Sequence, residues 1–186
     1  AAGTGFLALL KRYRPREPVN GVVVAVPASD LAGSGPTELE AIAQAVRRRL
    51  AELGDRLGLN LPVYLLVTKA DLIAGFREMF GDLDERSREQ VWGFTLPLGV
   101  AGAAAGERAA GEIALLVERL ENRTLDRLEA ERDPERRAVV QAFPAQIAAL
   151  VPPLQRFLDA AFAVTGYETP PVLRGVCSVI GANTVA

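Results

Sequence analysis

A strand–helix–strand pattern between residues 22 and 67 constrains the fold of this chain most strongly. Val22 to Val26 and Pro62 to Val67 are continuous apolar runs, and runs without alternation are typical of strands buried on both faces of a parallel sheet. Between them, apolar residues recur at steps of three and four from Leu39 to Leu57, which predicts a long amphipathic helix. Pro36 suits the first position of this helix and Gly58 suits its end. The pattern therefore predicts a βαβ unit with two parallel strands.

The remaining residues predict further helices and two shorter strands. We expect short helices at 5–14, 72–80 and 85–91, an extended edge piece at 92–97, a flexible connection or frayed helix start at 99–111, long helices at 113–133 and 135–164, and a last strand at 172–176. Pro144 and the pair Pro152-Pro153 are expected to kink or split the second long helix. The sequence thus predicts one α/β domain, with the sheet in 1–98 and 165–186 and a helical extension in 99–164.

Composition narrows the possible chemistry. The chain has 186 residues, is 49% hydrophobic and carries a net charge of −2, which suits one substantial core and gives no electrostatic reason to expect nucleic-acid binding. The absence of histidine excludes His-based catalysis and His metal sites, and the single Cys177 excludes an internal disulfide. No apolar run approaches the roughly 18 residues of a membrane span. The first residues lack Met and read as the middle of a helix, so we expect a fragment of a longer protein.

One motif follows the second predicted strand. Thr68-Lys69-Ala70-Asp71 fits the pattern [N/T]-K-x-D of the base-reading loop in Ras-like GTPases. One carboxylate can accept both the N1–H and the N2–H₂ of guanine, which is the role of Asp71 in this interpretation. The methylene stem of Lys69 would cover the base, and Thr68 would connect neighbouring loops. The alternative is structural, with Asp71 as the N-cap of a helix that starts at Leu72.

A nucleotide-hydrolysing site requires more than this loop. Nucleoside triphosphates are held by a glycine-rich loop, GxxxxGK[ST], with its Lys and a Mg²⁺-binding hydroxyl, and no such stretch occurs in the chain. Residues 30–33 match the letters DxxG, but no phosphate-binding loop precedes them, so we interpret the match as coincidence. Residues 1–186 alone are therefore not expected to hydrolyse a nucleoside triphosphate or to bind a cofactor through its phosphates.

Several segments resemble the IcmF-type, or TssM-like, inner-membrane proteins of bacterial type VI secretion systems. The segments are spread in the family's order over most of residues 6–176 and include TKADLIAGF, the run Gln90-Val91-Trp92-Gly93 and the pair Phe143-Pro144. The resemblance implies a cytoplasmic domain of an inner-membrane protein, with a partial Ras-like, P-loop GTPase-like fold and a helical extension. It also implies that the phosphate-binding loop lies upstream, so that GTP and Mg²⁺ would concern the intact protein as a GTPase or ATPase. The chain departs from the family after Val176, because Ile180 stands where a small polar base-contacting residue is usual.

The sequence leaves two functions open. A third possibility is an unrelated α/β domain in which the motif occurs by chance. The first is a scaffold that docks other membrane-complex and baseplate proteins of the secretion system. The second is a nucleotide switch in which Lys69 and Asp71 bind guanine once the missing half is present. Candidate docking surfaces are the charged face of the 113–133 helix and the acidic turn at Asp82 and Asp84, although both also fit an ordinary solvated surface.

Overall fold

The protein is built on a four-stranded sheet, seen in a computed structural model that describes residues 2–14, 18–84, 91–97, 103–163 and 171–179. The strand order is β1-β2-β4-β3, with β1, β2 and β4 parallel and β3 antiparallel to β4 at one edge. The strands are β1 (Val22–Pro27), β2 (Pro62–Thr68), β3 (Val91–Thr95) and β4 (Val172–Val179). The class is therefore mixed α/β with a mostly parallel sheet.

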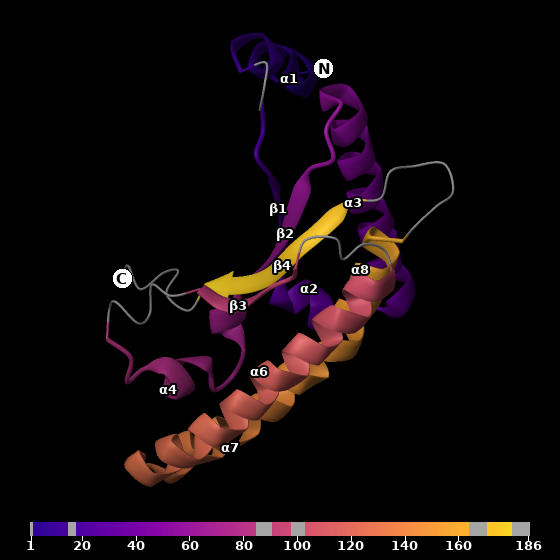
Figure 1. Ribbon diagram of the computed structural model, residues 1–186. Coiled ribbons are helices and arrows are strands. Elements are labelled where there is room, and N and C mark those ends of the chain that lie inside the picture. The colour runs from indigo at the N-terminus through magenta and orange to yellow at the C-terminus, as the bar shows by residue number, and fades with distance from the viewer. Residues whose placement is uncertain (1, 15–17, 85–90, 98–102, 164–170, 180–186) are drawn as a thin grey trace.

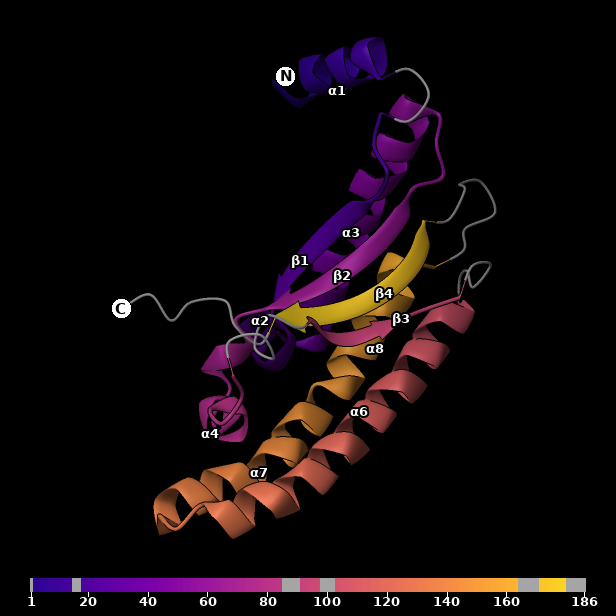
Figure 2. The ribbon, with the colours of Figure 1, turned by 60° about the vertical axis from the view of Figure 1, so that its left-hand side comes forward.

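The helices that pack on the sheet all lie on one face of it, and the others lie beyond its ends. They are α1 (Ala2–Tyr13), α2 (Ala28–Gly33), α3 (Pro36–Leu57), the 3₁₀ turn η1 (Ala70–Leu72), α4 (Phe76–Phe80), α6 (Ala103–Ala130), α7 (Pro134–Ala149) and α8 (Val151–Ala161). Helices α3 and α8 pack together beneath the sheet, and α6 and α7 run side by side beyond its edge (Figure 1; Figure 2). We call α6 and α7 together the hairpin.

The predicted βαβ unit is confirmed. Strands β1 and β2 pair in parallel register from Val22 opposite Val63 to Pro27 opposite Thr68. Helix α3 begins at Pro36 and ends before Gly58, whose φ of 67° is the left-handed conformation that glycine adopts at low cost. The last predicted strand is β4, and the extended piece at the sheet edge is β3.

The expectation that the first two strands are buried on both faces is wrong for the described residues. In β2, Val63, Leu65 and Val67 are buried against the helices, whereas the alternate residues are only half-buried. In β1, Val23 is 64% exposed and Ala25 is also exposed. The physical reason is that α3, α6 and α8 all pack against the same face, so the other face has no cover within the described residues (Figure 2).

The helical half differs from the sequence expectation in three places. The helix expected at 72–80 is divided into η1 and α4, and α6 already begins at Ala103. Helix α7 continues through Pro144, which is buried, so the break expected there is wrong. The split expected at Pro152-Pro153 is confirmed, because α7 ends before Leu150 and α8 begins at Val151. A proline destabilises a helix least in the first turn, because the N–H groups there have no intrahelical acceptor and no hydrogen bond is lost. Pro152 lies in the first turn of α8. The helix predicted at 85–91 lies almost wholly outside the described residues, apart from Val91, which begins β3.

Two apolar clusters hold these elements together. The larger one joins the covered face of the sheet to α3, α8 and the first turns of α6, with Leu65, Phe157 and Leu173 fully buried. The second one lies beside the β3 edge of the sheet, with Trp92 packed against it, where α4 contacts both α6 and α7 around Phe76, Phe80 and Phe143. The hairpin is thus attached to the sheet at its base and to α4 along its length.

Candidate functional site

The Thr68-to-Asp71 motif lies at the carboxyl-end rim of the parallel strands, where α/β proteins bind ligands. Strand β2 ends at Thr68, and Lys69 then adopts φ 57°, the only positive φ of a non-glycine residue among those described. This turn directs the chain into η1, with Asp71 at its centre. A left-handed lysine costs about 1 kcal/mol or more, and such strained residues cluster at functional sites.

The structure places the three motif residues differently. Lys69 is exposed and lines an open groove of about 420 Å³ between α2, η1 and the helices α7 and α8. Thr68 is half-buried beside Pro27, and its hydroxyl has no hydrogen bond within the described residues. Asp71 is half-buried and is not part of the groove lining. The motif therefore reaches the rim as expected, but Lys69 and Asp71 do not share this groove.

The alternative role of Asp71 as a helix N-cap is wrong. Asp71 lies inside η1, the residue before η1 is Lys69, and no side chain caps this turn. Within the described part of the chain, the Asp71 carboxylate has no hydrogen bond or ion pair. A half-buried carboxylate without a partner is available to accept hydrogen bonds from a ligand.

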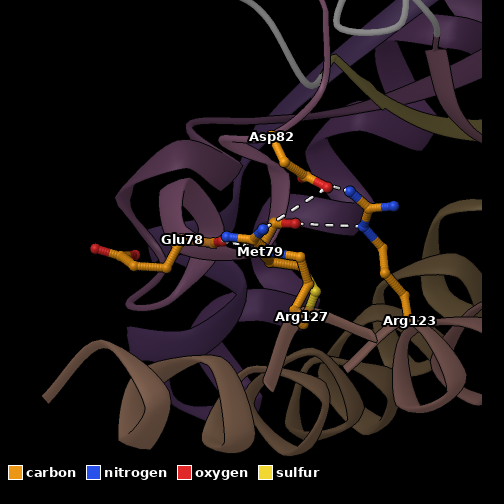
Figure 3. A network of polar contacts seen from close by, with 5 residues as sticks. All are labelled: Glu78, Met79, Asp82, Arg123 and Arg127. Atoms are coloured by element: carbon orange, nitrogen blue, oxygen red, sulfur yellow. Dashed lines mark hydrogen bonds and ion pairs between the residues drawn. The ribbon is translucent and has the colours of Figure 1, made fainter. Parts of the chain in front are cut away.

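The other candidate, the acidic turn after α4, forms a network with the hairpin (Figure 3). Arg123 donates to the Asp82 carboxylate at 2.6 Å and to the Met79 carbonyl at 3.3 Å. Arg127 donates to the Glu78 carbonyl through Nη2 at 2.8 Å and Nε at 3.1 Å, and lies 3.7 Å from Asp82. Asp82 therefore attaches the turn after α4 to α6. It also remains exposed, so its place in a candidate docking surface stays a prediction.

Aromatic packing reinforces the same contact. The guanidinium of Arg123 lies 5.8 Å above the Phe80 ring, a cation–π distance. The Phe143 ring meets Phe76 and Phe80 edge to face, each at 5.9 Å between centroids. Sequence reasoning missed this network, although the spacing of Arg123 and Arg127 places both on one face of α6. Their partners in the turn could not be identified from spacing within one helix.

The network yields a stability prediction. Arg127→Met should lower the free energy of unfolding by about 2–3 kcal/mol, because it leaves the Glu78 carbonyl without its two donors. Arg119→Met on the same helix is the matched control and should cost under about 0.5 kcal/mol. Arg119 is exposed and has no hydrogen bond or ion pair with the residues that the structure describes. Urea unfolding of both variants checks this, and equal costs would show that the network is dispensable.

Other chemistry has little support in the described residues. They contain no group of three or more His, Cys, Asp or Glu side chains arranged to hold a metal ion. Cys177 is half-buried, its thiol donates to the Leu65 carbonyl at 3.6 Å, and burial raises the pKa of this thiol. A raised pKa keeps the thiol protonated at neutral pH, where it is a poor nucleophile.

Membrane-spanning segments were sought in the described ranges as well. None of the helices there combines the length and the apolar character that crossing a bilayer requires.

Comparison with known proteins places the chain in a family. Residues 3–185 match the IcmF-related N-terminal domain, so the chain belongs to the IcmF-related family. It is 45% identical over 185 residues to the type VI secretion system component TssM1 of Pseudomonas aeruginosa. This similarity covers 98% of the chain but only 17% of the length of that relative. No solved structure matches the chain. The family resemblance read from the sequence is thereby confirmed.

Proposed function

We propose that residues 1–186 form a docking domain of a type VI secretion membrane-complex protein and contact other components of the apparatus through the hairpin. The family and the likeness to TssM1 support the secretion role. The proposal includes a place on the cytoplasmic side of the bacterial inner membrane, with membrane-complex or baseplate proteins as partners. The observation that carries it is the outward face of α6.

This face combines length with exposed apolar anchors. Helix α6 has 28 residues, which at 1.5 Å per residue is about 42 Å, far longer than a connection between the antiparallel neighbours β3 and β4 requires. Leu115 and Leu125 are 47% and 64% exposed on it, and they are among the few large apolar side chains of the described residues that lie in solvent. Charged residues such as Glu118 and Arg119 lie between them and are exposed. Apolar anchors within a polar rim are typical of protein–protein interfaces.

The hairpin is held in one orientation, which favours docking. Arg123 and Arg127 attach α6 to the turn after α4, and the Phe143 cluster attaches α7 to α4. At the far end, the Asp133 carboxylate caps α7 by accepting from the N–H groups of Glu135 and Arg136. A surface that is ordered before binding loses less conformational entropy when a partner docks.

A capture experiment tests the proposal. The complete polypeptide carrying Leu115→Asp and Leu125→Asp should retain other type VI secretion components at least tenfold less well than the wild type. Leu9→Asp and Leu72→Asp are matched controls, because these leucines are also exposed but lie on α1 and η1. Capture that is unchanged in the α6 variant, or lost equally in the controls, would contradict docking through the hairpin.

A second function, guanine-nucleotide binding within a P-loop GTPase-like fold, is favoured by the rim geometry. The strained backbone of Lys69 and the unpartnered carboxylate of Asp71 lie directly after a parallel strand. Asp71 would accept from the guanine edge, and the Lys69 stem would cover the base. The phosphates and any Mg²⁺ would be held by a loop of the GxxxxGK[ST] type, which is not among residues 1–186.

Replacing the Asp71 carboxylate by an amide tests this second function. In the complete polypeptide, Asp71→Asn should lower affinity for GTP by at least tenfold and raise the preference for xanthosine triphosphate. The reason is that the amide replaces one acceptor by a donor, which xanthine can satisfy. Asp30→Asn, at the same rim on α2, is the control. Competition binding of the two nucleotides provides the measurement, and an unchanged preference would remove Asp71 from this role.

A further inference from the structure

The sheet has a second face that no described element covers. Side chains alternate between the two faces along each strand, so the residues next to those packed against the helices belong to this second face. They are Val23 and Ala25 of β1, Tyr64 and Leu66 of β2, Gly175 and Cys177 of β4, and Gly93 and Thr95 of β3. We call these residues the open face. Figures 1 and 2 show every helix that packs on the sheet on the opposite side.

The composition of the open face is that of an interior. None of its residues is charged. The neighbouring Arg174 lies at the irregular register of β4 and is half-buried, and its carbonyl accepts from the Leu96 N–H. Parallel strands exposed to water normally alternate with polar residues or are covered by helices on both faces. Val23 is nevertheless 64% exposed, and the run VVVAV of β1 is apolar on both of its faces. Such a surface is expected to be buried in the functional protein.

The occupant that fits is a pair of helices. Four strands spaced about 4.8 Å apart span roughly 14 Å between the outer strand axes. Two helices packed about 8–10 Å apart match this width. A Cβ atom at Gly93 or Gly175 would clash with a backbone oxygen of the paired strand, so both glycines allow β3 and β4 to pair closely.

We propose that the open face is covered by helices from another part of the same complete polypeptide. The relative TssM1 has far more chain than these residues, since the similarity spans only 17% of its length. An uncharged face suits a permanent intramolecular contact, because transient partners dock on surfaces that are more polar. Docking of secretion components is then left to the hairpin, on the opposite side of the sheet (Figure 2).

Thiol labelling tests this inference with a matched pair. Val23 and Leu125 are both 64% exposed, one on the open face and the other on α6. In the complete, purified polypeptide, Val23→Cys should react with N-ethylmaleimide at least tenfold more slowly than Leu125→Cys, as read for each peptide by mass spectrometry. Equal rates would overturn the inference.

Two further outcomes distinguish other occupants. If slow labelling at position 23 disappears on dilution as the protein dissociates, a second copy covers the face and the inference is wrong. If protection appears only after other secretion components are added, a separate protein covers it, which also overturns the inference. Protection that is independent of concentration and of added proteins supports the intramolecular cover.

Discussion

Replacing Phe143 by alanine is expected to lower the free energy of unfolding by about 4 kcal/mol, within the usual range for truncating a fully buried phenylalanine. The side chain is completely buried on α7 and lies at the centre of the cluster that joins α4 to the hairpin. Truncation removes the apolar contacts, leaves a cavity and ends two edge-to-face ring contacts, each worth about 0.5–1.5 kcal/mol.

The same change should loosen one part of the molecule more than another. Amide hydrogen exchange is expected to increase first in α4, because its Phe76 and Phe80 lose their partner. Protection in β1 and α3, which belong to the larger cluster, should fall only with the global stability. Leu125→Ala is the control, since this exposed side chain should cost under about 0.5 kcal/mol. A loss below about 2 kcal/mol for Phe143→Ala would show that α4 does not depend on this cluster.

Gly75→Ala should destabilise the protein by about 3 kcal/mol, combining backbone strain and overpacking. Gly75 has φ 87°, a conformation that other residues rarely adopt. A Cβ atom there would lie 2.5 Å from the Val139 carbonyl oxygen of α7 and 3.1 Å from the Phe143 Cβ. The backbone between η1 and α4 would have to move away from the hairpin to accommodate it.

A glycine within α6 provides the opposite result. Gly111 is helical, and a Cβ added to it meets nothing within 4 Å. Gly111→Ala should therefore raise the free energy of unfolding by about 0.5–1 kcal/mol through helix propensity alone. Chemical denaturation of the two variants compares the same substitution at two sites. Equal and small effects would indicate that Gly75 does not fix the approach of α4 to α7.

Local signals predicted the elements that depend on local chemistry. The Pro36 start, the apolar stripe and the Gly58 stop are all short-range, and α3 has these bounds. The parallel pairing of β1 and β2 followed from the length of the connection between them. The position of Asp71 at the rim followed in turn, because residues that leave parallel strands meet at one edge.

The features that were missed depend on contacts distant in sequence. The valines and alanine of β1 predicted a strand buried on both faces of the sheet, but the exposure of each face depends on which helices pack against it. Pro144 read as a helix break, yet the packing of α7 keeps the helix intact through this buried residue. The contacts of Arg123 and Arg127 join residues more than 40 positions apart. No periodicity within α6 could identify Asp82 or the carbonyls of α4 as their partners.

Site-specific photo-cross-linking at Leu125 tests docking through the hairpin most directly. A photoreactive amino acid would replace Leu125 in the complete polypeptide, and in parallel Leu72, which is similarly exposed at 68%. Irradiation in cells that assemble the secretion apparatus should yield an adduct between position 125 and another secretion component, with little or none from position 72. Adducts formed only from position 72, or none from position 125 in an assembled apparatus, would contradict the account.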